Sequence, residues 1–537
     1  MQDYSRSRHS RFANDFATPE APHIYAGLRA YDSATWFVVI ALLLQTILST
    51  SLALRSNGTY QDDELRHYLV ARTMQHDWRM LLNVWGRPGF TILMAAPASI
   101  GQIATGFEAT RLMTVVLAVL TSVLAYLAAR QIKAPLPWLV PWLLLLMPLW
   151  MGLSFTPTTE MAAAFYLMAG TWRLAHGQRR WAAVCFALLP LTRHELIVLL
   201  VPATGYFLLR RDFWAFLLLG WAEALWNLLA IIAGEKLPLQ RFFAPIDQGH
   251  LGHGNVLHYF NRWLEMGGTA IVGLTLAGAA MVMAREANHW RRLGASSPAA
   301  RRARMRLFIA GGAVGVVALQ TLLYQFNRFA SGGYARFLIP IAPWMAITCL
   351  FAIVALLRGR RPVLLLITAA VILAACYSKS WITINTPCYV AATVLVALAI
   401  AWRIRLTAAM ALAILLCLNA LQWRSDVHPY LIQPHQILIK NAIAELQQQF
   451  PNERIVGASP WVKYFQNQSM DEDEADARRR WEQDDPPGVL YLYDQSHATA
   501  VPLDWFTAFP SRIVMDRWLP SDADDEPYLQ VLQRLPN

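Results

Sequence analysis

Residues 61–88, QDDELRHYLVARTMQHDWRMLLNVWGRP, follow the first apolar run of the chain and carry charges of both signs. The stretch opens with three consecutive acids, from Asp62 to Glu64, and closes with the pair Arg87 and Pro88. A carboxylate can act as a general base, and a guanidinium group is suited to bind a phosphate. An acid cluster followed by a cation beside a membrane therefore predicts a site that deprotonates an alcohol and holds a phosphate.

The composition is that of a membrane protein. Of the 537 residues, 56% are hydrophobic and only 15% are charged. Apolar runs long enough to cross a hydrocarbon core of roughly 30 Å recur between residues 35 and 422. Because an α-helix satisfies its own backbone hydrogen bonds inside lipid, these runs predict an all-α polytopic membrane protein.

The net charge of +11 is unevenly distributed. Residues 1–423 hold 36 Lys and Arg against 17 Asp and Glu, whereas residues 424–537 hold 10 against 18. The excess of base lies in short loops between apolar runs, where it sets membrane orientation. The charge therefore predicts no nucleic-acid partner.

The positive-inside rule predicts the topology. Residues 1–34 are polar and basic and read as a cytoplasmic N-terminal tail, so the first span delivers an outer loop, residues 55–110. Residues 89–106 are expected to form a helix at the outer interface. About thirteen spans are expected in a transmembrane domain of residues 35–423, with the C-terminus outside. These spans cover residues 35–54, 111–129, 136–153, 158–175, two short segments of 181–209, 213–233, 268–284, 307–324, 337–357, 363–378, 387–401 and 406–422.

The segment from residue 424 onward has a different character. Helix-like HQILIKNAIAELQQQF is followed by strand-like ERIVGAS, a short helix at residues 461–466, an acidic loop and strand-like VLYLYDQ. Alternating helices and strands predict a small α/β domain of residues 424–537 on the outer side. No glycine-rich phosphate loop is present in this sequence, so no chemistry is assigned to the domain.

The acids Asp62, Asp63 and Glu64 allow three interpretations. They can cap the helix that follows and complement its dipole. They can include a general base, because crowded carboxylates beside an apolar surface tend to have a raised pKa. They can also share a divalent ion, for which Mg²⁺ or Mn²⁺ would fit better than Zn²⁺, and a metal site would use Asp62, Asp63 and Glu160.

Several cations and acids interrupt apolar runs or begin them. Arg87 either binds a phosphate or extends its side chain to lipid headgroups. Arg193 and Glu195 interrupt an apolar run, and Glu160 begins one, so each is a functional candidate unless Arg193 simply pairs with Glu195 or with Glu160.

Two further groups are predicted on the outer side. Arg328 and Arg336 flank the glycine-containing loop FNRFASGGYAR, and Arg336 is the better placed to bind a lipid headgroup. His258 forms a cluster with His250 and His253, which either binds a metal or hydrogen-bonds to substrate or water.

Together these motifs resemble the GT-C class of polytopic glycosyltransferases, especially the group containing protein O-mannosyltransferases and lipid A aminoarabinose transferases. The resemblance covers about residues 35–345. It rests on the order of six motifs, which are Asp63-Glu64, Arg87-Pro88, Arg111, Glu160, Thr192-Arg193 and the segment from Arg336 to Pro340.

The resemblance implies a bundle of about thirteen transmembrane helices in the bacterial inner (plasma) membrane, with a periplasmic C-terminal domain. It also implies transfer of a mannose-like or other sugar from a polyprenyl-phosphate-linked donor to a lipid, glycan or protein acceptor, with inversion. Asp63 would be the general base, and Glu160 would support it or orient the acceptor. Asp62 and Glu64 are further catalytic candidates. The residues that would bind the lipid phosphate or substrate are Arg87, Arg193, Arg336, Arg328 and His258.

Two motifs depart from the pattern. Some relatives carry an acid where this chain has Gly86, and the Thr192–Glu195 turn resembles dolichol- and GPI-type mannosyltransferases instead. A lipid-linked sugar transporter or flippase, and a surface-polysaccharide polymerase or ligase, are the alternative functions. A transferase predicts polar groups gathered at one membrane face, whereas a transporter predicts them at the midplane.

Overall fold

The computed structural model describes most of the chain. The described residues are 28–83, 85–242, 258–292, 297–326, 333–358, 427–457, 459–468, 485–494, 510–517 and 528–536, with 413, 416, 417, 419, 420, 423, 481 and 503. The predicted cytoplasmic tail before residue 28 and the predicted spans at 363–378, 387–401 and most of 406–422 lie outside them. The total of thirteen spans therefore stays a prediction.

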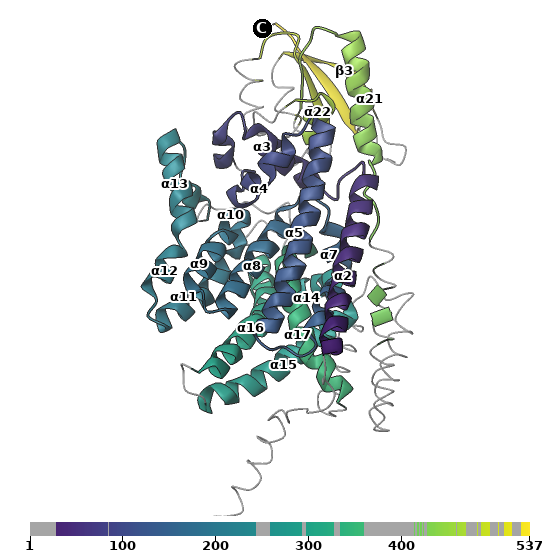
Figure 1. The fold of residues 1–537 in the computed structure, drawn as a ribbon. Coiled ribbons are helices and arrows are strands. Elements are labelled where there is room, and N and C mark those ends of the chain that lie inside the picture. Colours follow the sequence, from purple (N-terminus) through teal and green to yellow (C-terminus); the bar gives the residue numbers. More distant parts are fainter. Residues whose placement is uncertain are drawn as a thin grey trace, which may run out of the picture.

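Five helical segments of the described residues are long and apolar enough to cross a membrane. They coincide with five predicted spans and pack side by side in one bundle (Figure 1). These segments are α2 (Leu28–Arg55), α5 (Ile103–Gln131), α15 (Thr269–Arg292), α16 (Pro298–Gln325), and η6 (Ala335–Ile341) continued by α17 (Ala342–Leu357).

Four apolar runs, which were predicted as five spans, are shorter or broken in the structure. The run at 158–175 is the single helix α8 (Thr159–Ala175), whereas proline or glycine residues accompany breaks in the other three runs. Proline lacks the N–H that an uninterrupted helix needs. The pieces are η2 (Pro137–Leu139), α6 (Val140–Leu145), α7 (Pro148–Leu153), α9 (Arg179–Ala187), α10 (Leu189–Thr192), η3 (His194–Leu199), α11 (Leu200–Leu209), α12 (Phe213–Leu218) and α13 (Trp221–Ala233).

The loop after α2, residues 55–110 and called the first loop below, is mostly helical. It contains α3 (Asp62–Thr73), η1 (Trp78–Leu82) and α4 (Pro88–Ala98). Proline is favoured at the first position of a helix because its missing N–H is not needed there, which explains the start of α4. Both α3 and α4 lie at the same end of the bundle as the C-terminal sheet (Figure 1).

Two shorter elements lie between α13, the last piece of the broken runs, and α15. They are η4 (Pro238–Phe242) and α14 (His258–Gly267), and α14 packs against η6 and α16.

The C-terminal segment contains two helices and a small sheet. The helices are α21 (Pro434–Gln449) and α22 (Pro460–Phe465), at the positions predicted from the sequence. The sheet has the order β1-β2-β4-β3, in which β1 and β2 are parallel and the other pairs are antiparallel. The strands are β1 (Ile455–Gly457), β2 (Leu490–Asp494), β3 (Ser511–Arg517) and β4 (Leu529–Arg534). The prediction contained β1 and β2 and missed β3 and β4.

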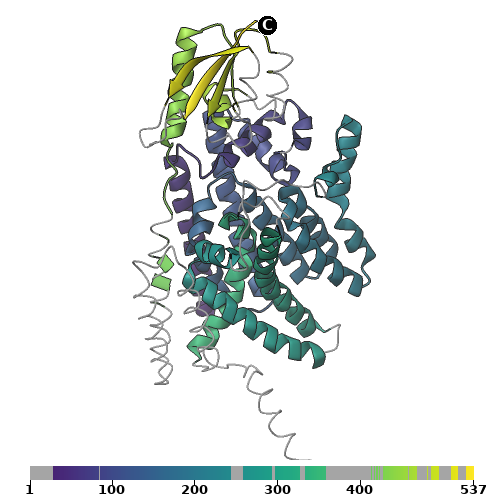
Figure 2. The same cartoon turned by 180° about the vertical axis from the view of Figure 1, so that it is seen from behind.

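The C-terminal segment is attached to the first loop by a shared core and by backbone hydrogen bonds. Buried apolar side chains of α3, α4 and the sheet form one cluster, which includes Leu65, Phe90 and Leu490. Tyr430 accepts hydrogen bonds at its carbonyl from the N–H groups of Asn57 (3.0 Å) and Gly58 (2.9 Å). Seen from behind, the strands and α21 lie together beyond the end of the bundle (Figure 2).

Candidate functional site

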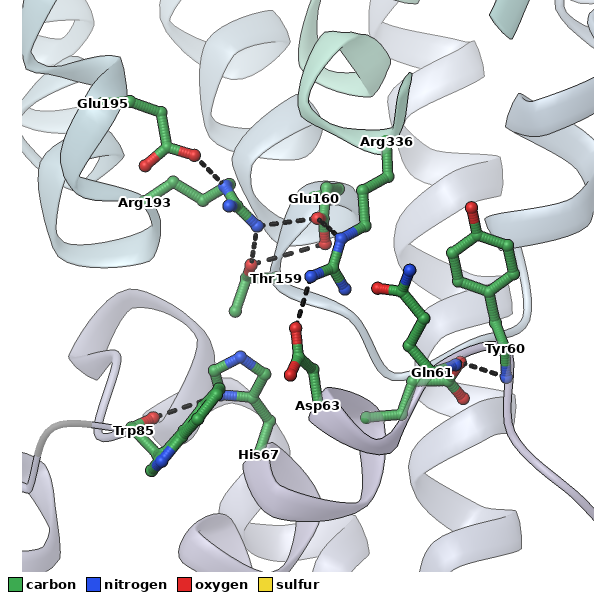
Figure 3. A network of polar contacts seen from close by, with 11 residues as sticks. Tyr60, Gln61, Asp63, His67, Trp85, Thr159, Glu160, Arg193, Glu195 and Arg336 are labelled. Atoms are coloured by element: carbon green, nitrogen blue, oxygen red, sulfur yellow. Dashed lines mark hydrogen bonds and ion pairs between the residues drawn. The ribbon is translucent and has the colours of Figure 1, made fainter. Parts of the chain in front are cut away.

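A network of ion pairs joins four elements that are distant in sequence. Asp63 comes from the first turn of α3, Glu160 from the first turn of α8, Arg193 from the break between α10 and η3, and Arg336 from η6. Figure 3 shows the four side chains converging. The structure therefore brings together four of the residues that the sequence singled out.

Arg336 occupies the centre of this network. Its Nη2 donates a hydrogen bond to Oδ2 of Asp63, and its Nε lies 3.5 Å from Oε1 of Glu160. The side chain of Arg336 is only 6% exposed and that of Glu160 is 0% exposed, whereas that of Asp63 is 30% exposed. Asp63 is therefore the member of this trio that a substrate can reach.

Arg193 forms both of the pairs that the sequence left as alternatives. Its Nη1 donates to Oε1 of Glu160 at 2.6 Å and to Oγ1 of Thr159 at 3.0 Å, while its Nε donates to Glu195. Its guanidinium carbon lies 3.9 Å from the ring centroid of Phe337. A buried carboxylate is tolerated where it is paired, and Glu160 has two guanidinium partners.

The break in the apolar run positions Arg193. The residue caps α10 in an extended conformation, with φ −149° and ψ 121°, before η3 begins at His194. This interruption at residues 192–195 confirms the sequence prediction, and it points the side chain at α8 rather than along a helix.

Arg87, just before α4, contacts His194 at the break between α10 and η3. Its Nη1 lies 2.7 Å from Nε2 and 3.0 Å from Nδ1 of His194. The approach depends on Gly89, where an added Cβ would lie 2.5 Å from Oγ1 of Thr192, and on the hydrogen bond from the Tyr166 hydroxyl to the Gly89 carbonyl (3.0 Å). Close packing of α4 on α10 therefore brings Arg87 to the neighbourhood of Arg193.

The absence of an acid at Gly86 has a steric reason. A Cβ at this position would lie 2.3 Å from the carbonyl oxygen of Met80 and 2.9 Å from that of Leu81. No side chain, acidic or otherwise, is accommodated there unless the backbone moves.

The three consecutive acids point to three different partners, because successive residues of an α-helix are rotated by about 100°. Asp63 faces Arg336, while Oδ1 of Asp62 accepts a hydrogen bond from Nε1 of Trp461 at 2.8 Å. Oε1 of Glu64 accepts hydrogen bonds from the backbone N–H groups of Tyr60 (2.6 Å) and Gln61 (3.2 Å). Glu64 therefore forms a capping box with the N-cap residue Gln61 at the start of α3, in keeping with the capping interpretation of the sequence.

The environments of these acids shift their pKa values in opposite directions. Burial raises the pKa of Asp63, but the charge and the hydrogen bond of Arg336 outweigh burial and hold this pKa below its ordinary value. Burial raises the pKa of Glu64 to about 8, although the Arg111 guanidinium and the two backbone N–H groups oppose the shift. Asp63 is therefore ionised at neutral pH, which a proton acceptor requires.

The predicted metal set is not assembled in this arrangement. Asp62 faces the C-terminal segment, whereas Asp63 and Glu160 are bound to guanidinium groups. Among the residues that the structure describes, no group of three or more His, Cys, Asp or Glu side chains is placed to hold a metal ion.

His258 lies apart from the ion-pair network. Its Nε2 is 2.9 Å from the carbonyl oxygen of Gly333, whose φ of +67° and close approach to the imidazole exclude a side chain. Its ring lies 4.5 Å from that of Tyr324. His258 therefore anchors the turn before η6. Arg328, His250 and His253 lie outside the described residues.

His67 is a member of the site that the sequence interpretation missed. It lies four residues after Asp63 on α3, and its Nδ1 is 3.1 Å from the carbonyl oxygen of Trp85. The spacing of four residues, which places two side chains on one helix face, was the signal that could have found it.

Comparison with known proteins identifies the fold. No family model and no curated protein matches the chain. Solved structures do match, among them ArnT from Cupriavidus metallidurans in the apo state (TM-score 0.52, 13% identity) and bound to undecaprenyl phosphate (TM-score 0.52, 15% identity). Each match covers 95% of this chain and 100% of the ArnT chain. The chain has the GT-C fold.

Within this GT-C fold, the network combines three chemical capabilities. Asp63 is an ionised and partly exposed carboxylate that can accept a proton. Arg87, Arg193 and Arg336 present guanidinium groups, which bind phosphate oxygens in a fork. The buried Glu160 neutralises part of this positive charge and holds the guanidinium groups of Arg193 and Arg336 in place.

Proposed function

We propose that this chain is a glycosyltransferase. It transfers a sugar from a polyprenyl-phosphate-linked donor to an acceptor hydroxyl at the periplasmic face of the bacterial inner membrane. The observation that carries the proposal is the placement of Arg336 between Asp63 and Glu160, which sets a base directly beside a phosphate-binding cation. The fold of ArnT, which has been solved with undecaprenyl phosphate, supports a lipid-linked donor.

The reaction proceeds by direct displacement. Asp63 takes the proton of the acceptor hydroxyl, and the acceptor oxygen forms a bond to the anomeric carbon of the sugar. The bond from that carbon to the phosphate oxygen breaks on the opposite face, so the configuration inverts. The bonding electrons leave with the polyprenyl phosphate, whose growing charge is stabilised by Arg87, Arg193 and Arg336.

The ion pair between Arg336 and Asp63 links donor binding to base strength. While Arg336 is bonded to Asp63, the pKa of that carboxyl stays below its ordinary value. A phosphate that binds Arg336 competes with Asp63 for the guanidinium group, so the carboxylate becomes a stronger base when the donor is present.

The position of the network favours a transferase over a transporter. The helices α3 and α4, which contribute Asp63 and Arg87, lie at one end of the bundle beside the C-terminal sheet (Figure 1). A transporter is expected to bind its cargo near the middle of its spans.

The test compares Asp63→Asn with Asp62→Asn in purified protein and in membranes. Transfer of radiolabelled sugar from undecaprenyl-phosphate-linked donors to envelope acceptors should fall by roughly 10²- to 10⁴-fold in Asp63→Asn. Asp62→Asn removes a neighbouring charge that faces Trp461, so it should retain most of the activity. Unchanged transfer, and unchanged envelope glycans by mass spectrometry, in Asp63→Asn would remove this residue from the chemistry.

A further inference from the structure

His67 is held rigidly at the edge of the ion-pair network. The residue is 6% exposed, and its imidazole contacts the rings of Trp85 (centroids 5.6 Å apart) and Phe90 (5.5 Å). Nδ1 lies 3.1 Å from the Trp85 carbonyl oxygen. Three contacts therefore fix the ring plane, and His67 cannot turn away without losing them.

The hydrogen bond to Trp85 determines which ring nitrogen carries the proton. A carbonyl oxygen only accepts, so Nδ1 must be the donor and must bear a hydrogen. In the neutral ring Nε2 is then unprotonated and offers a lone pair. Figure 3 shows the second ring nitrogen on the side of Thr159 and Asp63, facing the network.

The surroundings keep the ring neutral. Burial lowers the pKa of His67 to about 3. The carboxylate of Asp63 opposes this shift. Three guanidinium groups of the site reinforce it, those of Arg87, Arg193 and Arg336. The ring therefore presents a hydrogen-bond acceptor, and not a cation, throughout the physiological pH range.

The neighbours of His67 identify what occupies the space in front of it. In the proposed reaction Asp63 contacts the acceptor hydroxyl and the arginines contact the phosphate. The transferred sugar is bonded to that phosphate and is attacked by that hydroxyl, so it must lie between the two sets of groups. His67 lies one helical turn after Asp63 on α3, and its second ring nitrogen faces Thr159, which accepts a hydrogen bond from Arg193, so in the proposed reaction this nitrogen borders the sugar.

We propose that His67 recognises the glycosylated lipid that donates the sugar. Its Nε2 accepts a hydrogen bond from a hydroxyl group of that sugar. This inference rests on the proposed glycosyl transfer. Guanidinium groups only donate hydrogen bonds, so the arginines of the site cannot accept one from a sugar hydroxyl. The unprotonated nitrogen of His67 can accept it. His67 thereby distinguishes a glycosylated lipid phosphate from the bare lipid phosphate that remains after transfer.

Two substitutions separate this role from a structural one. In His67→Asn the side-chain amide nitrogen can replace Nδ1 and keep the bond to Trp85, but no atom reaches the position of Nε2. In His67→Gln the amide oxygen can occupy the position of Nε2, while the bond to Trp85 is lost. Melting temperatures of both variants in nanodiscs establish that they are folded.

The experiment measures binding of undecaprenyl phosphate and of its mannosyl, glucosyl and 4-aminoarabinosyl derivatives in nanodiscs. All three proteins should bind the bare lipid phosphate alike, because the arginines are unchanged. For the glycosylated lipid that wild type prefers, His67→Asn should lose about five- to tenfold in affinity, and His67→Gln should retain most of it.

The outcomes are distinguishable. If wild type prefers one glycosylated lipid and His67→Asn binds it equally well, the recognition role of His67 is overturned while the proposed function stands. A stronger loss in His67→Gln than in His67→Asn would make the bond to Trp85, and hence a structural role, the function of this residue. If wild type binds neither the bare lipid phosphate nor any of its glycosides, the proposed function itself fails.

Discussion

Arg336 is bonded to Asp63 from an element 273 residues further along the chain, and the same guanidinium group lies 3.5 Å from Glu160. One cation thus serves an exposed carboxylate and a fully buried one. In the proposed reaction the partly exposed Asp63 is available to substrate, whereas the buried Glu160 holds Arg336 in place when a substrate phosphate displaces Asp63. This asymmetry underlies the predictions for Arg336 and Glu160.

Substitution of Arg336 should change the pH dependence of transfer. In Arg336→Gln the interaction that lowers the pKa of Asp63 is lost, and burial is left to raise it. The acidic limb of the plot of kcat/KM against pH should therefore move to higher pH, besides an overall loss of rate. Arg262→Gln, which breaks a half-exposed pair with Glu265, is the control and should leave the limb in place. An unmoved limb in Arg336→Gln would contradict the role of Asp63 as the base.

Glu160 should be more important for stability than a surface acid. Glu160→Gln leaves two buried guanidinium groups with less compensating charge, and breaking such a buried pair typically costs about 3–5 kcal/mol. Glu265→Gln, in which the lost partner is 30% exposed, should cost at most about 1 kcal/mol. Thermal unfolding in nanodiscs measures both, and equal melting temperatures for the two variants would refute the difference.

Glu64 should make the protein less stable as the pH rises. Its pKa is about 8 in the folded chain against an ordinary 4.5, so the folded state binds more protons between these values. The stability contributed by protonated Glu64 is complete below about pH 4.5 and is lost as the pH rises toward about 8. Glu64→Gln resembles the protonated form and should flatten the melting temperature over this window. A variant with the pH dependence of wild type would show that Glu64 is not the group responsible.

Trp461 should couple the C-terminal segment to α3. Trp461→Phe removes the 2.8 Å hydrogen bond to Asp62 and keeps an aromatic ring, so the expected loss of stability is about 1 kcal/mol. Asp62→Asn retains an oxygen that can accept from Trp461 and should be milder. Limited proteolysis near residues 427–433 reports the loosening, and the idea is wrong if Asp62→Asn is cleaved faster than Trp461→Phe.

Much of the site could be predicted because charges are conspicuous in apolar surroundings. Glu160 and Arg193 were singled out because they begin or interrupt apolar runs, where a charge is costly unless it is paired or functional. Asp63 was singled out in a cluster of three acids, and Arg336 beside a glycine-containing loop at the start of a span. The pairs of Arg193 with Glu160 and with Glu195 were open alternatives, whereas the contacts of Arg336 with Asp63 and Glu160 could not be predicted, because they join elements far apart in the sequence. His67 escaped notice for the opposite reason, since one histidine in a polar helix is unremarkable until its neighbours are known.

The fold was predictable to a similar degree. Long apolar helices such as α5 and α16 are evident from hydropathy, and the break at Arg193 was predicted, whereas the run containing Pro141 and Pro148 was taken as one span and is broken in the structure. The mean hydropathy of a run hardly changes when the run contains a proline, although proline lacks the backbone N–H that an uninterrupted helix needs. In the C-terminal segment β3 (SRIVMDR) and β4 (LQVLQR) were missed because polar and charged residues interrupt or flank their apolar residues, so neither shows the apolar run that marked β2.

The bonds between Tyr430 and the first loop have a consequence for biogenesis. The N–H groups of Asn57 and Gly58 donate to the carbonyl of Tyr430, which is synthesised more than 370 positions later. Two neighbouring hydrogen bonds join residues that are 374 and 375 positions apart in the chain. Contacts of such long range form late in folding. The loop that carries Asp63 therefore lacks these hydrogen-bond acceptors until residue 430 has been synthesised, and a product terminated before that residue would leave the loop without them even with every residue of the ion-pair network present.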